Sequence, residues 1–409
     1  MLHRYFPSQH IGVVKGQARE IAVGVARLYE LMSRIYFYSN ETLPIIYTAV
    51  RFVNEAERAG TSPELATAYA SMSILAGFMQ LHNLADAYVM RGIDVAKKVN
   101  QPSNRVTVNV VTGVYQITVG KWEEVRTKAL EAKVICEQLG DYRQWGDSTV
   151  LLAESALIAG DIQFALNIQK ILLEDARRRR NPLQQIWSLF GIAANSIRLG
   201  EEADSIPMLE EALQILAELP NLASSINTNA QLALAHHRLG QREKSLAYAG
   251  RVLDLAANLS PTVYSLDVGF SAVAEVYFEL WENALRNPDH GAGSDQLKLS
   301  AEKAIKLLTA FKRVFPIGQP FLAYYQGWHE WLIGKPDAAM RSWNKGLAAA
   351  QRFNLPYEEG LLRTKLGLYV KDDDERKAHF ERAVQIFEKM GAVRELQFVR
   401  AQTQKRFNS

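Results

Sequence analysis

The sequence predicts an all-α solenoid, a row of helix–turn–helix repeats stacked in series. Four glycines recur at a constant interval of 40 residues, at Gly120, Gly160, Gly200 and Gly240. Seven positions before each of them stands a small residue: Gly113, Ala153, Ala193 and Ala233. Glycine and proline, 25 and 13 of 409 residues, are scarcer than in average proteins, which argues against a loop-rich β chain. A fixed period of this kind is typical of repeat architectures.

The turn glycines predict how each repeat is built. Each one ends a run of helix-forming residues, and glycine suits the left-handed position that closes a helix. A second set of stops lies about 20 residues away, between the helix pairs. These stops are Gly60, Asn100, Gly140, Asn181, Asn221, Ser260, Asn354 and Gly391. Each repeat is therefore expected to be a pair of antiparallel helices, which small residues allow to pack closely.

The alternating stops predict the elements in order. The first pair turns at Ser39-Asn40 and the second at His82-Asn83. The first six pairs are expected at 17–60, 62–100, 103–140, 143–180, 182–220 and 222–259. Apolar residues within them recur at steps of three and four, the stripe of a packed helix.

The next pair breaks the period. Its turn is due near residue 280, but a Pro, Asp and Gly-rich stretch predicts a longer exposed loop at 287–294. One further pair turns at 334–336 and the last at 372–374, and a single helix from about residue 393 caps the array. The domain prediction is one solenoid over 1–409. It comprises an extension at 1–16, regular repeats at 17–260, an irregular repeat at 261–316, and terminal repeats with the cap at 317–409.

Period, small-residue pattern and helical pairing together resemble tetratricopeptide repeats. That family has a unit of about 34 residues, so the helices or turns here are expected to be longer. The family's proline at the end of the second helix is mostly absent, although Pro220 and Pro356 lie near such ends.

Three passages carry a narrower resemblance. They are "AERAGTSPELA" at 56–66, "EQLGDYRQWGD" at 137–147, and "WHEWLIGKPDAAMRSWNKGLAAAQRFNLPYEEGLLRTKLG" at 328–367, the last followed by "HFERAVQIFEKMGAVRELQ". In this order they resemble the helical-repeat tail of bacterial relatives of soluble adenylyl cyclase. The resemblance covers about 30–400 and implies a regulatory tail that follows class III cyclase domains and an ATPase module.

The motifs that catalysis would need are missing from the sequence. There is no G-x-x-x-x-G-K-[ST] phosphate loop, and no strand-rich segment offers the paired aspartates of a cyclase. No Ser/His/Asp or Cys/His arrangement stands in a strand-turn-helix context. The chain is therefore predicted not to be an enzyme and to hold no cofactor.

The charge balance and the cysteine count limit which partners and metal sites are expected. The formal net charge is +3, from 47 basic and 44 acidic residues, so neither nucleic acid nor a membrane surface is expected. The single cysteine, Cys136, excludes an intramolecular disulfide and a multi-thiolate metal site. The start lacks a signal-peptide pattern and no window is apolar enough to span a bilayer, so a cytoplasmic location is expected.

Four polar features are expected to be structural. The run Arg177 to Arg180 ends a helix, where cations complement the helix dipole, although it also suits an acidic partner surface. His236 and His237 point about 100° apart on a helix and cannot readily hold one ion, so no metal is predicted. The acidic run at 372–375 is expected to begin a helix. The glycines at 291 and 293 follow no strand, so they are not expected to cradle phosphate.

The remaining candidate is the concave groove formed by the first helix of each repeat. Residues 13, 10, 6 and 2 positions before a turn glycine should face it. The candidate partner-binding residues are Asp147, Glu154, Trp187, Phe190, Arg198, Asn227, Arg238, Phe321, Tyr324 and Trp328. Arg198 and Arg238 stand in one row, suited to a carboxylate or acidic peptide. The last three form an aromatic patch, which either binds a partner or packs between repeats.

The sequence thus predicts a non-catalytic repeat scaffold that binds a protein or peptide as the regulatory or sensor region of a signalling protein. Two alternatives stay open. The chain is the tail of a larger cyclase or ATPase whose catalytic domains lie elsewhere, or it is a sensor of a small ligand or peptide.

Overall fold

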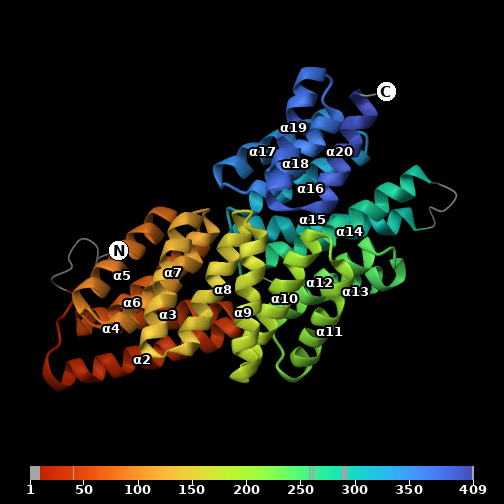
Figure 1. The fold of residues 1–409 in the computed structure, drawn as a ribbon. Helices are drawn as coiled ribbons and strands as arrows, with labels where there is room; N and C mark the ends of the chain where they lie inside the picture. The colour runs from red at the N-terminus through yellow and green to blue at the C-terminus, as the bar shows by residue number, and fades with distance from the viewer. Residues whose placement is uncertain are drawn as a thin grey trace. The chain divides into compact units, whose positions relative to one another are not determined.

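A computed structural model of the chain describes residues 10–39, 41–257, 259, 261, 263–287 and 293–407. Over these residues the chain forms nineteen helices and no strand (Figure 1). None of the described helices is long and apolar enough to cross a membrane.

The helices group into two compact units, Met1–Leu152 and Ala153–Ser409. The helices of unit 1 are α2 (Gly16–Tyr38), α3 (Thr42–Ala59), α4 (Pro63–Phe78), α5 (His82–Val99), α6 (Pro102–Thr118) and α7 (Trp122–Leu139). Helix α8 (Tyr142–Ile158) contains the boundary between the units. The prediction of one solenoid domain over the whole chain stays a prediction.

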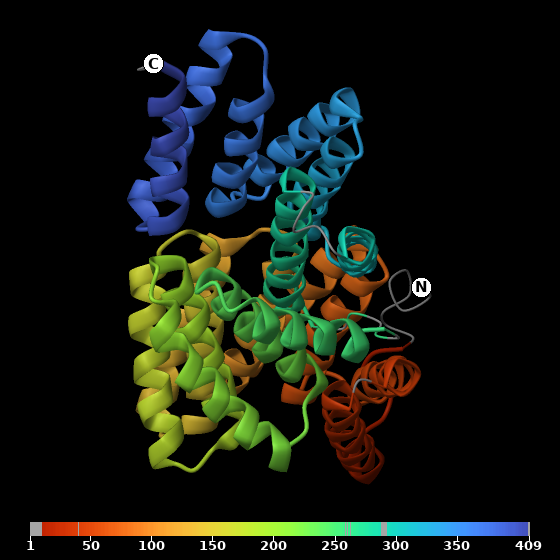
Figure 2. The same cartoon turned by 90° about the vertical axis from the view of Figure 1, so that its right-hand side faces the viewer.

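Unit 2 has the same pattern of antiparallel pairs, seen in yellow to blue in Figures 1 and 2. Its helices are α9 (Ile162–Arg178), α10 (Pro182–Leu199), α11 (Glu202–Glu218), α12 (Leu222–Arg238), α13 (Arg242–Leu255), α14 (Leu266–Arg286), α15 (Ser294–Val314), α16 (Gly318–Leu332), α17 (Pro336–Arg352), α18 (Pro356–Tyr369), α19 (Asp373–Met390) and α20 (Val393–Phe407). The predicted helix pairs and the final single helix are confirmed in number and order.

The turn glycines have the backbone that the sequence predicts. Gly160 has a φ of 86° and Gly200 a φ of 83°, in the left-handed region that favours glycine. The small residues before the turns lie under large side chains. A Cβ added at Gly113 would lie 2.5 Å from a methyl of Leu151, and one at Gly327 2.5 Å from the indole nitrogen of Trp343. The helices can therefore pack this closely only because Gly113 and Gly327 have no side chain.

The irregular repeat differs from its neighbours in helix length. Helices α14 and α15 have 21 residues each, whereas α3 to α13 have 14 to 18; only α2, with 23 residues, is longer among the described helices. The expected turn position near residue 280 lies inside α14, which continues to Arg286. Most of the predicted loop at 287–294 lies outside the described residues, as do residues 1–9 of the predicted extension, Asn40 of the first turn and Ser260.

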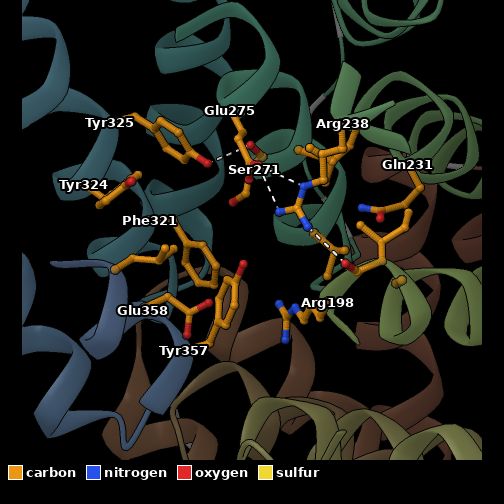
Figure 3. Close-up of a pocket in the computed structure, with 16 residues that line it drawn as sticks. Arg198, Gln231, Arg238, Ser271, Glu275, Phe321, Tyr324, Tyr325, Tyr357 and Glu358 are labelled. Atoms are coloured by element: carbon orange, nitrogen blue, oxygen red, sulfur yellow. Dashed lines mark hydrogen bonds and ion pairs between the residues drawn. The ribbon is translucent and has the colours of Figure 1, made fainter. Parts of the chain in front are cut away.

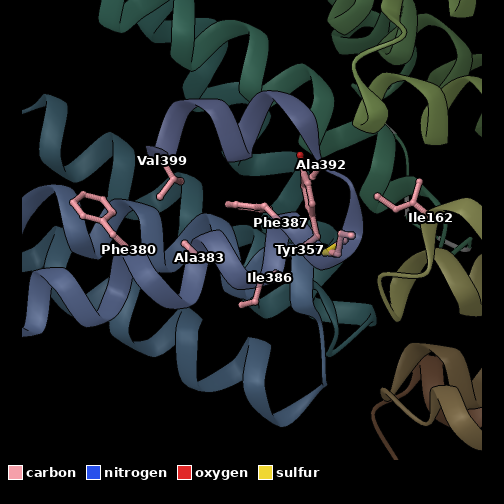
Figure 4. Packing of buried hydrophobic residues seen from close by; sticks show 9 residues of the cluster. Ile162, Tyr357, Phe380, Ala383, Ile386, Phe387, Ala392 and Val399 are labelled. Atoms are coloured by element: carbon pink, nitrogen blue, oxygen red, sulfur yellow. The ribbon is translucent and has the colours of Figure 1, made fainter. Parts of the chain in front are cut away.

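The last hairpins of unit 2 return to its beginning. Ile162 of α9 joins a buried cluster with Phe387 and Met390 of α19 (Figure 4). A Cβ at Gly160 would lie 2.9 Å from Pro356, the first residue of α18. The repeats of unit 2 thus close on themselves, and the first helices of its hairpins line an interior pocket.

Candidate functional site

The pocket lies within unit 2 and is lined by α10, α12, α14, α16 and α18 (Figure 3). These are the first helices of five successive hairpins. The lining residues are Ala194, Ile197, Arg198, Gln231, Leu234, Arg238, Val268, Ser271, Ala272, Glu275, Phe321, Tyr324, Tyr325, Tyr357, Glu358 and Leu361. The cavity volume is about 60 Å³, which accommodates a few waters or one side-chain-sized group.

Arg238 is held in place by its neighbours. Its guanidinium donates to Glu275 at 2.9 Å, to Glu395 at 3.1 Å and to the backbone oxygen of Ile197 at 3.0 Å. Its side chain is 2% exposed. Burial works against its charge, but Glu275 and Glu395 outweigh it and raise the pKa of Arg238 well above its ordinary value. Arg238 therefore ties α12 to α14 and α20.

Arg198 has a different environment. Its guanidinium carbon lies 4.3 Å from the centroid of the Tyr357 ring, a cation–π contact. Within the described part of the chain it makes no hydrogen bond or ion pair, and its side chain is only half-buried. Arg198 therefore keeps its donors available at the pocket wall (Figure 3).

Two buried carboxyl groups, those of Glu358 and Asp267, interact with the charge of Arg198, and Glu154 interacts with Asp267. Burial raises the pKa of Glu358, and the positive charge of Arg198 opposes this effect. Burial raises the pKa of Asp267 to about 7, and that of Glu154 also to about 7. Tyr264 donates a hydrogen bond to the Glu154 carboxylate. Near neutral pH, Asp267 and Glu154 are therefore each partly protonated.

The opposite wall is aromatic. The rings of Tyr324 and Tyr325 meet edge to face at 4.9 Å between centroids, and Tyr325 donates a hydrogen bond to the Ser271 backbone oxygen at 2.9 Å. Behind them, the Lys365 ammonium nitrogen lies 3.2 Å from the centroid of the Trp328 ring. Burial lowers the pKa of Lys365 to about 8. Trp328 donates to Glu282 at 2.9 Å, so this side chain is anchored within the fold.

The structure brings four of the ten predicted groove residues together at the pocket. These four are Arg198, Arg238, Phe321 and Tyr324. Asp147 belongs to unit 1. Trp187 and Phe190 are half-buried on α10 and do not line the pocket.

The other three predicted residues make contacts inside unit 2. Asn227 donates to the Ser265 backbone oxygen at 3.1 Å, and Glu154 accepts the bond from Tyr264. Trp328 packs between repeats.

The pocket also contains residues that the sequence analysis missed. Glu358 and Leu361 lie 13 and 10 positions before Lys371, and Ser271 and Glu275 lie on α14. The hairpin of α18 has no turn glycine, and the expected turn near residue 280 lies inside α14, so neither hairpin offered a correct reference position. Counted back from residue 280 the offsets give 267, 270, 274 and 278, and counted back from Asp372 they give 359, 362, 366 and 370, so the expected turns would not have found these residues.

The polar features outside the pocket have local partners. Arg177 pairs with Glu211 at 2.6 Å, and Arg179 pairs with Asp175 at 2.9 Å. His237 lies 2.8 Å from Glu279. The Asp372 side chain accepts from the Glu375 backbone N–H at 2.8 Å, which caps α19.

Neither a reactive thiol nor a metal site is found among the described residues. Burial raises the pKa of the Cys136 thiol to about 11. Among the described residues, no group of three or more His, Cys, Asp or Glu side chains is arranged to hold a metal ion.

Comparison with solved structures identifies the fold. A Rap protein complexed with competence and sporulation factor matches with a TM-score of 0.59 and 12% identity, over 91% of this chain and 99% of that one. The Rap conjugation regulator of plasmid pLS20, in complex with the Phr* peptide, matches with a TM-score of 0.54 and 12% identity, over 90% and 97%. A human IFIT1 dimer with m7Gppp-AAAA matches with a TM-score of 0.50 and 13% identity, over 98% and 91%. The fold is a tetratricopeptide-like α-solenoid.

At these identities the likeness concerns the fold. No protein-family model and no curated protein matches the chain.

Proposed function

We propose that this tetratricopeptide-like solenoid is a non-catalytic scaffold that binds a peptide or protein segment, with an acidic group of the partner at Arg198. The observation that carries the proposal is the contrast between two arginines in equivalent positions. Arg238 is fully engaged by Glu275 and Glu395, whereas Arg198 lines the pocket without an ion pair among the described residues. A guanidinium with free donors suits a carboxylate.

The other lining groups support a peptide as the ligand class. The Ser271 hydroxyl is buried without a hydrogen-bond partner, and Gln231 lines the same cavity. Such groups suit backbone amides, while Phe321 and Tyr324 offer apolar contact to a side chain. The two Rap structures are complexes with a factor and with a peptide, which supports the same class here.

Nucleic acid fits this pocket poorly, although the human IFIT1 dimer is a structure with m7Gppp-AAAA. The lining carries two arginines and two glutamates, so it lacks the excess of positive charge that phosphate binding requires.

Selection from a displayed random-peptide library tests the proposal. The wild-type chain should enrich peptides that share an Asp, a Glu or a free carboxyl terminus. The variant Arg198→Glu should bind the selected peptides at least about tenfold more weakly, since like charges then meet. Arg180→Glu, at an exposed helix end, is the matched control and should bind as the wild type does. Equal binding by Arg198→Glu would overturn the proposal.

A small-molecule ligand is the alternative occupant. A thermal-shift screen of metabolites against wild type and Arg198→Glu separates the two classes. Stabilisation by a metabolite that Arg198→Glu abolishes, with no peptide enriched, would favour a small-ligand sensor.

The narrower proposal is that the scaffold regulates a cyclase or ATPase module. It rests on the resemblance of the passages at 56–66 and 328–367 to the tails of such proteins. Co-expression with class III cyclase and ATPase modules from the same genome should yield a stable complex if the proposal is right. The chain purified alone should hydrolyse no nucleotide.

A further inference from the structure

Helix α2 of unit 1 carries apolar side chains on two opposite faces. Ala22 and Ala26 are buried on the face that packs within the unit. The other face carries five exposed apolar side chains, here called the α2 stripe: Ile21, Leu28, Leu31, Met32 and Ile35. Their exposed fractions are 37–62%, and their spacing of three, four and seven residues places them on one side of the helix. A continuous exposed apolar stripe marks an interaction surface.

Gly24 adds an independent observation in the same stripe. It lies one turn from both Ile21 and Leu28, in the interior of α2, where glycine costs about 1 kcal/mol relative to alanine. A Cβ at Gly24 would meet nothing within 4 Å. Packing inside the chain therefore gives no reason for the missing side chain, whereas close approach of another helix does.

We propose that the α2 stripe binds the α2 stripe of a second copy of this chain, with the two helices antiparallel about an axis near Leu28. The stripe is symmetric around that residue, since Ile21 and Ile35 each lie seven positions from it. An antiparallel pair brings Ile21 of one copy to Ile35 of the other. It also places Gly24 opposite Met32, so the long side chain enters the gap that glycine leaves.

The charges beside the stripe favour this occupant and this direction. Glu20 and Arg34 lie on the same side of α2 near its two ends, are exposed, and make no hydrogen bond or ion pair within the described residues. In an antiparallel pair, Glu20 of each copy meets Arg34 of the other. A parallel pair would leave Glu20 and Arg34 at opposite ends of the contact, where they could not pair. Arg27, midway between them, is already paired with Glu64 at 2.7 Å.

Sedimentation and light scattering on the full chain test the pairing. The wild type should be a dimer at micromolar concentration, and Leu28→Glu should be a monomer because two carboxylates would meet at the axis. Leu299→Glu is the matched control, since Leu299 is a 52% exposed leucine on α15, and it should remain dimeric. Circular dichroism should show that both variants keep their helix content.

A charge exchange tests the direction. Glu20→Arg should weaken dimerisation about tenfold or more, and the double change Glu20→Arg with Arg34→Glu should restore it. A single cysteine at the axis gives a second readout. Leu28→Cys, in a Cys136→Ala background, should form a covalent dimer with a short bismaleimide, whereas Leu299→Cys should not.

Some results would reject the second copy as occupant. A wild-type chain that is monomeric at all concentrations means that another segment or another protein covers the stripe. A dimer that survives Leu28→Glu means that the interface lies elsewhere. Either result overturns the proposal and leaves the peptide pocket of unit 2 untouched, because the two surfaces share no residue.

Discussion

At the scale of single residues, Arg198 and Arg238 show how position in a repeat differs from role. Both stand two positions before a turn glycine. Arg238 meets the carboxylates of α14 and α20, whereas Arg198 meets the face of Tyr357. The repeat pattern predicts that both side chains face the interior. It does not predict which residues of the later hairpins each arginine will contact.

The two arginines should therefore differ in their effect on stability. Arg238→Met leaves the buried Glu395 without its cation and Glu275 with Arg394 alone, at 3.6 Å, and should cost about 3–5 kcal/mol of unfolding free energy. Arg198→Met loses one cation–π contact and should cost about 1 kcal/mol or less. Urea denaturation measures both. Similar losses in the two variants would show that Arg198 is also a structural residue.

The buried acids predict a pH dependence. Burial raises the pKa of Glu154 from 4.5 and that of Asp267 from 3.8, in each case to about 7 in the folded chain. The folded state thus holds these protons more tightly than the unfolded state. The contribution of each group to stability is full below its ordinary pKa and is lost as pH rises through about 7.

Glu154→Gln should remove one of these contributions. Between about pH 5 and pH 8 its unfolding free energy should fall less than that of the wild type, by on the order of 1–3 kcal/mol. Thermal and urea unfolding across this range measures the difference. Glu381→Gln, at an exposed position on α19, is the control and should follow the wild-type curve. Parallel curves for wild type and Glu154→Gln would refute the assignment.

At the scale of helices, glycine has opposite consequences at different positions. Gly327→Ala on α16 would drive a methyl against Trp343, at 2.5 Å from its indole nitrogen, and should cost about 1–3 kcal/mol. Gly250→Ala on α13 meets nothing within 4 Å and should stabilise the chain by about 0.5–1 kcal/mol through helix propensity. Chemical denaturation measures the change in unfolding free energy for both variants, which should be opposite in sign. A stabilising Gly327→Ala would contradict the close packing of α16 on α17.

Element positions were largely predictable because turns and small residues are local signals. The stops at Asn100 and Gly140 end α5 and α7, as the pattern predicts. Arg198 and Arg238 follow from counting back from Gly200 and Gly240, whereas Trp187, Phe190 and Asn227, counted in the same way, do not line the pocket. The pocket residues on α14 were missed because that helix continues past the expected turn to Arg286, and those on α18 because its hairpin turns without a glycine.

The contact between α20 and α12 could not be predicted from any local sequence pattern. The bond between Arg238 and Glu395 joins residues 157 positions apart. Such a contact depends on the summed twist of many repeats, and a small difference in each turn would shift it. The grouping into two units was equally absent from the pattern, because the glycine interval runs through residue 153 without a break.

At the scale of unit 2, Glu395 fastens the end of the array to its middle. It accepts from Arg238 at 3.1 Å and from the Tyr357 hydroxyl at 3.0 Å. Glu395→Ala removes both bonds and leaves Arg238 with fewer acceptors. Backbone amide hydrogen exchange should then become faster in α20 and at the end of α10. At that end Leu199 lies beside Gly391, since a Cβ added at Gly391 would be 3.4 Å from a methyl of Leu199. Unchanged exchange there would show that apolar contacts alone hold the closure.

Most solenoids can gain or lose a whole repeat, because each repeat contacts only its neighbours. Unit 2 lacks that freedom. One more or one fewer hairpin between α12 and α18 would carry Glu395 away from Arg238 and Met390 away from Gly160. The number of hairpins in this unit is therefore fixed by its own closing contacts. A chain in which a single hairpin of unit 2 is duplicated should therefore have a lower unfolding free energy than the wild type. It should not form a stable, longer array.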